Sequence, residues 1–405
     1  MNKLKHFLLN SKNINKSSFI WNMAGSMLMA FQSVIMLMII TRTLNLYEAG
    51  VFTLAYASAN LFLNIGKYGM RNFQVSDVKR QFNFKEYNTS RIITTLLMLI
   101  VSLVYVVIAK SKNDYSMNKT WIIIWMCLFK IVDSIEDAYL GYYQQENRLD
   151  VAGKILTLRM ILTILVFGLG LIFLRDQLMS LMIATIFTTL LLIMFVTLTY
   201  PAFRKEESVH KGKVWELLRV CFPLFLGCFL AFYIGNAPKY AINTYYDETV
   251  QNSYNILFMP AFVINLLSLF VFRPLLTDLA RDWEGENIKE FTDIVKKMMI
   301  LIGALTIAAC VGAYLLGIPI LSLVYGVDLR AYRMELVIIM ICGGLNAYVY
   351  CLYYVVTVTG KQIFLLLGYG AGLIFAVFLG SSFVKSLGML GAALSCTLSF
   401  GVVFI

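Results

Sequence analysis

The sequence predicts an all-α integral membrane protein of about twelve transmembrane helices, arranged as two six-helix halves. Three observations predict it. Of the 405 residues, 60% are hydrophobic and only 14% are charged, and the mean hydropathy is +0.75. Apolar stretches long enough to cross a bilayer recur along the chain, and lysine and arginine are frequent in every second segment between them. These features exclude a water-soluble globular protein and a disordered chain.

Six apolar stretches form the first half, and each has a length that lets a helix cross the ~30 Å hydrocarbon core. The first is too long for the apolar part of a signal peptide and lacks a small-residue cleavage site, so we expect it to be retained. All are expected to be helices, because lipid offers backbone groups no other partner and no strand-like alternation is present. The six stretches are 18–40, 49–65, 92–109, 120–140, 155–173 and 178–198.

The second half repeats this pattern after a strongly polar segment at 199–219. We therefore predict two domains, an N-terminal six-helix lobe at 1–205 and a C-terminal six-helix lobe at 206–405. Six stretches in the same orientation in each half are typical of a parallel internal duplication about an axis along the membrane normal. The six stretches of the second half are 220–242, 254–272, 298–316, 336–356, 363–379 and 389–405.

The distribution of lysine and arginine predicts the orientation, because cytoplasmic segments carry an excess of both. With the N-terminus inside, the inside segments hold 23 of these residues and the outside segments hold 9. The net charge of +11 therefore reflects membrane orientation and predicts no nucleic-acid partner. The two longest basic inside segments, 66–91 and 273–297, each follow the second stretch of a half and are amphipathic. Their apolar residues are Phe73, Val75, Phe82, Phe84, Leu275, Leu276, Leu279 and Ile288.

Several kinds of chemistry find no support in the sequence. The seven cysteines lie in apolar stretches with no CxxC motif and no nearby histidine, so neither a disulfide framework nor a zinc site is predicted. The nearest approach to a phosphate-binding P-loop, Gly360-Lys361-Gln362, lacks the first glycine and the hydroxyl. The predicted outer connections, about 4–20 residues long, leave little room for catalysis. We therefore predict no enzyme, no catalytic residue, no metal and no cofactor.

Charged residues inside the apolar stretches cost about 2.5–3.5 kcal/mol each on insertion scales, so each needs a partner or a purpose. Lys130 lies halfway along the fourth stretch, and Asp133, Glu136 and Asp137 follow it at helical spacing as one polar stripe. Arg159, one turn into the fifth stretch, lies at a similar depth. The favoured interpretation is an internal charge network that locks the two helices, since the charges nearly cancel. The alternative is that Lys130 faces a substrate cavity while the carboxylates tune it or carry a coupling proton.

Several stretches carry a resemblance to a known family. The most specific is Asn-Ala-Pro-Lys-Tyr-Ala-Ile at 236–242. The others are Thr-Arg-Thr-Leu-Asn-Leu-Tyr-Glu-Ala-Gly (41–50), Tyr-Gly-Met-Arg-Asn-Phe-Gln-Val-Ser-Asp (68–77), Gly-Tyr-Tyr-Gln-Gln-Glu-Asn-Arg-Leu (141–149), Arg-Pro-Leu-Leu-Thr-Asp-Leu-Ala-Arg (273–281) and Pro-Ile-Leu-Ser-Leu-Val-Tyr-Gly (319–326). Over its whole length the chain resembles the polysaccharide transporter family, the flippases of O-antigen and capsule units. That family belongs to the multidrug/oligosaccharidyl-lipid/polysaccharide (MOP) exporter superfamily.

The resemblance implies a MATE-like fold in which two six-helix lobes form a V. It implies a flippase that turns a polyprenyl-diphosphate-linked oligosaccharide, an O-antigen or capsule repeat unit, from the inner to the outer leaflet by alternating access. It further implies a multi-pass protein of the bacterial cytoplasmic membrane, with membrane lipids and other glycan-assembly membrane proteins as partners. One departure from the family is that the last stretch stops at Ile405 without a polar tail, so either the usual C-terminal extension is absent or the chain is incomplete.

The resemblance points to Lys239 and its neighbour Asn236, near the outer end of the seventh stretch, as substrate-binding residues. Pro238 beside them frees backbone groups and can break the helix, as happens where transporters bind substrate. An ammonium is a compact charge suited to a diphosphate. The alternative is a lysine that snorkels to the outer interface.

Further candidates for substrate binding are the cations Lys130, Arg42, Arg71 and Arg273. Arg42 ends the first stretch on the outer side, either as an interfacial anchor or as a ligand. Arg71 and Arg273 end the second and eighth stretches inside, where a headgroup would arrive from the cytoplasmic leaflet. Their alternative is that of ordinary positive-inside arginines. The predicted ion-coupling residues are Asp133, Glu136 and Asp137.

A MATE-type drug/cation antiporter of the same superfamily is the nearest alternative function. Its substrates are cations and favour an acidic cavity, whereas Lys239 and Arg71 are basic. A membrane glycan polymerase or transferase is less favoured, because the outer connections are short. A non-transporting scaffold of a glycan-assembly complex is the third alternative, and it predicts that neutralising Lys239 leaves glycan export intact.

Overall fold

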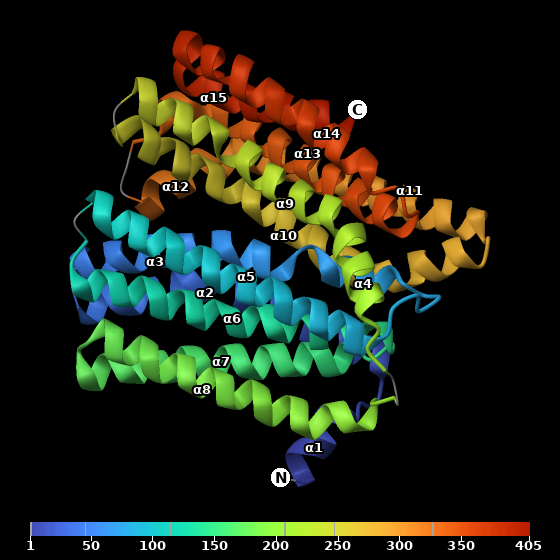
Figure 1. Ribbon diagram of the computed structural model, residues 1–405. Coiled ribbons are helices and arrows are strands. Elements are labelled where there is room, and N and C mark those ends of the chain that lie inside the picture. The colour runs from blue at the N-terminus through green and yellow to red at the C-terminus, as the bar shows by residue number, and fades with distance from the viewer. Residues whose placement is uncertain (1, 45, 114, 206–207, 247, 326–327) are drawn as a thin grey trace. The chain divides into compact units, whose positions relative to one another are not determined.

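The computed structural model describes residues 2–44, 46–113, 115–205, 208–246, 248–325 and 328–405 (Figure 1). Regular structure in these residues is helical throughout, with no strand among them, which confirms the predicted all-α class. The chain forms two compact units, Met1–Phe225 and Leu226–Ile405. Their boundary lies inside one helix, further along the chain than the predicted domain boundary between residues 205 and 206. The V-shaped arrangement of two lobes stays a prediction.

The described part of the first unit contains six long helices, and each holds one predicted stretch of the first half. A short helix precedes them, and another lies between the second and third long ones. The elements are α1 (Asn2–Leu9), α2 (Ile14–Thr43), α3 (Leu46–Lys67), α4 (Met70–Ser76), α5 (Phe84–Asn113), α6 (Met117–Gln145), α7 (Leu149–Leu174), α8 (Gln177–Thr199) and the short turn η1 (Tyr200–Ala202).

Capping side chains explain where two of these helices begin. At the start of α2, Asn13 Oδ1 accepts a hydrogen bond from the backbone N–H of Lys16 (3.0 Å). At the start of α8, Asp176 Oδ1 accepts one from the N–H of Met179 (2.7 Å). Each cap satisfies a backbone donor that the first turn of a helix leaves without a partner.

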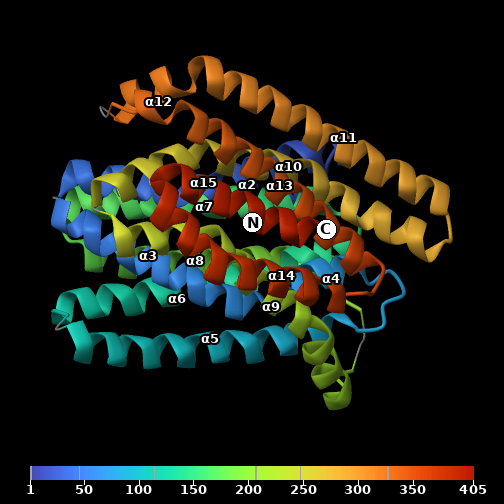
Figure 2. The same ribbon diagram turned by 90° about the horizontal axis from the view of Figure 1, so that it is seen from above.

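α6 is the central helix of the first unit, because it contacts α3, α5, α7 and α8. Figure 2 shows α5 beside the part of α6 that is visible in that view. More than half of the residues of α6 are buried, and four of these are charged. α2 packs closely on α7, because glycines at the contact leave room for the opposing backbone. A Cβ atom added to Gly153 of α7 would lie only 2.6 Å from the backbone nitrogen of Asn22 in α2.

The amino-terminal helix α1 is held against α7 by two buried side chains. Lys154 Nζ donates to the carbonyl oxygens of Phe7 (2.8 Å) and Asn10 (3.1 Å) and to Ser11 Oγ (2.8 Å). The hydroxyl of Ser11 in turn donates to Asp150 Oδ2 (2.6 Å). Because buried polar groups need hydrogen-bond partners, these contacts fix where α1 lies.

We expect Lys154→Met to release α1, because three hydrogen bonds of one ammonium are lost together. Amide exchange in residues 2–11 should rise about tenfold or more, while exchange in the long helices stays unchanged. Hydrogen–deuterium exchange with mass spectrometry measures both. Lys16→Met, at an exposed lysine of α2, is the control. Unchanged exchange in residues 2–11 would mean that apolar contacts alone hold α1.

The second unit contains most of α9 and all later helices. Its central helix is α13, which contacts α10, α11 and α15. Two short π-helical segments, η2 and η4, continue α11 and α14 into the following helices. The elements are α9 (Lys211–Tyr245), α10 (Glu248–Glu284), α11 (Ile288–Gly312), η2 (Ala313–Gly317), α12 (Ile318–Tyr325), η3 (Arg330–Tyr332), α13 (Arg333–Val358), α14 (Ile363–Phe375), η4 (Ala376–Gly380) and α15 (Ser381–Phe404).

Eight helical runs in the described ranges are long and apolar enough to cross a membrane. They hold nine of the twelve predicted stretches, because the last two stretches form one helical run, Ile363–Phe404. The predicted connection within this run is therefore wrong in its extent, since helix continues up to a kink at Gly388. Gly388 has φ 59° and ψ −128°, a backbone conformation that glycine adopts without strain. The other three predicted stretches lie in α3, α6 and α10.

The helix break that Pro238 permits does not occur. α9 continues through this proline to Tyr245. A proline inside a spanning helix removes one backbone hydrogen bond, but neighbouring helices and local adjustments can satisfy the carbonyl that it frees.

The predicted connection at 273–297 is also largely helical. α10 continues to Glu284, and α11 begins at Ile288. The apolar side chains of Leu276 and Leu279 in this segment are buried. Their burial inside the unit explains why the helix extends past the predicted end of the stretch.

Candidate functional site

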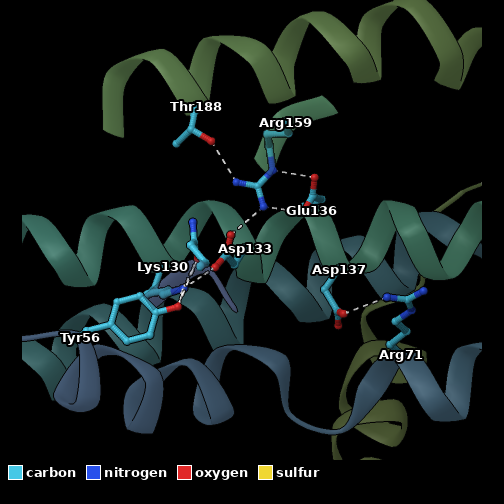
Figure 3. Close-up of polar contacts among 9 residues, drawn as sticks. Tyr56, Arg71, Lys130, Asp133, Glu136, Asp137, Arg159 and Thr188 are labelled. Carbon is cyan, nitrogen blue, oxygen red and sulfur yellow. Dashed lines mark hydrogen bonds and ion pairs between the residues drawn. The ribbon is translucent and has the colours of Figure 1, made fainter. Parts of the chain in front are cut away.

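A chain of buried polar contacts begins at Lys130, near the middle of α6 (Figure 3). Its Nζ atom lies 3.0 Å from Asp133 Oδ2 and 3.1 Å from the Tyr56 hydroxyl of α3. It also donates to Gln32 Oε1 of α2 at 3.0 Å. Lys130 is 2% exposed, so these three groups replace the water that its ammonium would otherwise bind. The lysine thereby links α6 to α2 and α3.

Arg159 of α7 joins this chain at the other oxygen of Asp133. Its Nη2 atom lies 2.6 Å from Asp133 Oδ1 and 2.6 Å from Glu136 Oε2. Its Nε atom donates to Glu136 Oε1 at 2.6 Å, so Arg159 and Glu136 form the two parallel bonds that make arginine–carboxylate pairs strong. Nη1 donates to Thr188 Oγ1 of α8 at 2.9 Å. Arg159 is fully buried and ties α6 to α7 and α8.

Asp137, the last member of the polar stripe, pairs with two arginines from α4 and α5. Arg91 Nη2 of α5 lies 3.0 Å from Asp137 Oδ2, and Arg71 Nη1 of α4 lies 3.5 Å from Oδ1. Arg91 also donates to the carbonyl of Gly66 (2.9 Å), and Arg71 donates to Gln144 Oε1 (3.2 Å). Asp137 therefore connects α6 to α4 and α5.

We call these seven charged residues the α6 charge network. Three carboxylates in it face four cations, and every member has at least one ion pair. Taking a charge out of water is costly, and the cost is offset only where opposite charges and hydrogen bonds surround it. The network meets this requirement and ties α6 to α2, α3, α4, α5, α7 and α8. Its members are Arg71, Arg91, Lys130, Asp133, Glu136, Asp137 and Arg159.

The structure brings together five of the residues that the sequence marked as binding or coupling candidates, namely Arg71, Lys130, Asp133, Glu136 and Asp137. It adds Arg91, which the sequence analysis missed. The predicted connection before the third stretch contains Arg91, but α5 begins at Phe84, and Arg91 is fully buried within it. Arg91 could be identified only from its place opposite the buried Asp137 carboxylate. That place depends on how α5 packs on α6, which the sequence does not show. The binding and coupling roles of these residues stay predictions.

Lys239 lies on α9 in the second unit and is half-buried. Its Nζ atom lies 5.2 Å from the centre of the Phe258 ring of α10, within the range of a cation–π contact. No carboxylate in the described part of the chain lies within ion-pair distance of this ammonium. It differs in this respect from the cations of the α6 charge network.

The remaining candidates are Asn236, Arg42 and Arg273. Asn236, one turn before Lys239, donates its side-chain N–H to the carbonyl of Phe232 (2.8 Å). Arg42 is exposed in the last turn of α2. Arg273 lies in α10, and its side chain is outside the described residues. Within the described ranges, no group of three or more His, Cys, Asp or Glu side chains is placed to hold a metal ion.

Solved structures share this fold at low sequence identity. The Vibrio cholerae MATE transporter VcmN in its bent form superposes with a TM-score of 0.76 at 12% identity, over 96% of this chain and 95% of that chain. A MOP superfamily transporter from Pyrococcus furiosus gives 0.74 at 11% identity, over 99% and 96%. The eukaryotic MATE transporter AtDTX14 gives 0.74 at 13% identity, over 96% and 93%. The fold is therefore MATE-like, as predicted, and the chain is a multi-pass membrane protein.

Sequence comparison identifies the family directly. No curated protein matches the chain. The model of a family described as polysaccharide biosynthesis protein matches residues 16–280, which include the whole α6 charge network as well as Lys239. That match extends over more than half of the chain and confirms the family type predicted from the sequence motifs. The chain therefore belongs to the polysaccharide biosynthesis protein family.

Proposed function

We propose that the chain is a flippase that moves a lipid-diphosphate-linked oligosaccharide, such as an O-antigen or capsule repeat unit, from the inner to the outer leaflet. The family and the MATE-like fold support a protein that moves a substrate across a membrane. Alternating access is the mechanism typical of transporters built from repeated helical halves. The membrane would be a bacterial cytoplasmic membrane, with the N-terminus inside.

The surroundings of the Lys239 ammonium are the observation that favours an anionic substrate. Lys130, Arg91 and Arg159 are each neutralised by a carboxylate. In the described part of the chain Lys239 contacts an aromatic ring and no carboxylate, which leaves its ammonium N–H donors for a ligand. A diphosphate offers several anionic oxygens and forms short, charge-assisted hydrogen bonds with such a donor. Lys239 thus supplies what a diphosphate needs and a cationic drug does not.

We expect Lys239→Ala to reduce translocation of a lipid-diphosphate oligosaccharide about 10- to 100-fold at low substrate concentration. Loss of one hydrogen bond to a charged group, about 1.5–3 kcal/mol, gives this magnitude. Lys239→Arg keeps the charge and should retain part of the activity. The measurement follows translocation in liposomes that contain the purified protein.

Lys385→Ala is the matched control, because Lys385 is an exposed lysine of the same unit. It should translocate at the wild-type rate. Translocation unchanged by Lys239→Ala would make Lys239 a snorkelling lysine and would remove the argument for an anionic cargo. Glycan transfer by the purified protein would instead indicate an enzyme, which we do not expect.

A drug/cation antiporter is the alternative that the buried carboxylates of α6 favour. However, Asp133, Glu136 and Asp137 are all paired with cations, which leaves less negative charge for a cationic substrate and argues against the antiporter. The same liposomes distinguish the two functions. Gradient-driven efflux of an organic cation, without movement of the lipid-linked glycan, would establish the antiporter.

A further inference from the structure

A long apolar groove lies on the first unit between α6 and α8. It encloses about 570 Å³ and is lined by side chains of α6 from Trp125 to Tyr139 and of α8 from Thr185 to Thr197. At 1.5 Å per residue the α6 side is about 21 Å long, compared with ~30 Å for the whole hydrocarbon core. The groove is therefore long enough to hold much of a lipid chain.

The hydroxyl groups of the threonines that line this groove are not available to an occupant. Thr185 donates its hydroxyl to the carbonyl of Leu181 (2.7 Å), and Thr189 donates to the carbonyl of Thr185 (2.7 Å). Thr197 donates to the carbonyl of Met194 (2.9 Å). Since each hydroxyl is satisfied within its own helix, the groove presents methyl and methylene groups to its occupant. An alkyl chain fits this surface.

A second, smaller pocket of about 240 Å³ adjoins the end of the groove. Tyr139 lines both spaces, so they adjoin at this residue. The Tyr139 ring lies 5.9 Å from that of Tyr200, edge to face, and the Phe84 ring lies 5.3 Å from Tyr139. Aromatic rings of this kind are typical of the level where hydrocarbon gives way to headgroups.

The smaller pocket is cationic. Lys85 of α5 and Arg204, which follows η1, line it together with Asn88, and none of its described lining residues is acidic. Both cations belong to segments that the lysine and arginine distribution assigns to the cytoplasmic side. Anionic lipids of the cytoplasmic leaflet are attracted to basic groups at this level, by about 1 kcal/mol for each lysine or arginine.

An apolar groove is followed by aromatic rings and then by two cations. A phospholipid presents matching groups in the same order, from its acyl chain through the interface to its phosphate. We propose that this surface binds an anionic phospholipid, with one acyl chain along α6 and α8 and its phosphate between Lys85 and Arg204. Lys85 and Arg204 offer the charge-assisted hydrogen bonds that suit a phosphate. The site is independent of the proposed transport function.

The test measures lipid binding to the purified full-length protein by native mass spectrometry and by thermal unfolding. Phosphatidylglycerol should remain bound and raise the unfolding temperature, because a ligand of the folded state stabilises it. Lys85→Gln with Arg204→Gln should weaken phosphatidylglycerol binding about tenfold or more and phosphatidylcholine binding much less. Thr189→Trp places a large ring in the groove at an exposed position and should weaken binding of both lipids.

Lys3→Gln with Lys5→Gln is the matched control, because it removes two exposed cations from α1 of the same unit. It should bind phosphatidylglycerol as the wild type does. An equal loss in this control, or no loss in the Lys85/Arg204 variant, would overturn the proposed site. Displacement of phosphatidylglycerol by a polyprenyl diphosphate at lower concentration would overturn it in favour of a site for a lipid carrier. None of these readouts requires transport, so failure of the flippase proposal would leave them unaffected.

Discussion

Replacing Arg159 with methionine should lower the free energy of unfolding by about 3–5 kcal/mol. The guanidinium is fully buried and bonds Asp133 and both oxygens of Glu136 at 2.6 Å. Its removal leaves the Glu136 carboxylate buried with no other ion pair in the described part of the chain. Methionine is apolar and nearly as long as arginine, so it leaves no large cavity. The loss of stability therefore reports the uncompensated charge. The loss of stability is measured by heating the detergent-purified protein and using size-exclusion chromatography to quantify the folded fraction that remains.

A double variant, Arg159→Met with Glu136→Met, separates charge from packing. Asp133 keeps its contact with Lys130 at 3.0 Å, so the carboxylate that remains is still paired. The double variant should therefore be more stable than Arg159→Met by about 2 kcal/mol or more. Thr188→Val removes only a hydroxyl acceptor of Arg159 and should cost about 1 kcal/mol. Wild-type stability of the single variant would show that the network does not hold α6, α7 and α8 together.

The second large effect is expected at Gly153, where α7 meets α2. Its alanine variant should lose about 1–3 kcal/mol of unfolding free energy. The added Cβ would lie 2.6 Å from the backbone nitrogen of Asn22 and 2.6 Å from the carbonyl carbon of Trp21. Because these are backbone atoms, α2 itself has to move, and the long α2–α7 contact is weakened along its length. The thermal midpoint of the purified protein measures the loss.

Gly168→Ala is the matched control on the same pair of helices. Its Cβ would lie 3.3 Å from Ile39 Cδ1, the end of a flexible side chain that can turn away. Alanine also favours helix over glycine by about 0.5–1 kcal/mol, so this variant should be neutral or slightly stabilised. Equal stability of the two alanine variants would show that α2 moves freely away from α7.

The class of the protein and the outline of its helices follow from the sequence. Each of the twelve predicted stretches lies in a helix, because a chain this apolar leaves its backbone no other partner in lipid. The polar stripe from Lys130 to Asp137 was also visible, since helical spacing places those residues on one side of α6 whatever surrounds them. The family followed from the short motifs, and the match to residues 16–280 agrees.

Helix ends and helix breaks did not follow from hydropathy. The segment at 273–297 is predicted as a connection, yet α10 extends through it to Glu284, and α11 begins at Ile288. There the burial of Leu276 and Leu279 inside the unit outweighs the local preference.

The sequence by itself determined that buried charges lie on α6 and that they nearly cancel. Only the tertiary structure decided which partners they have. Arg91 reaches Asp137 because α5 begins early and packs on α6, and Gln32 and Tyr56 reach Lys130 from α2 and α3. Helical spacing fixes which residues share a face, but a desolvated charge selects its partners from whatever the packed helices bring within about 3 Å.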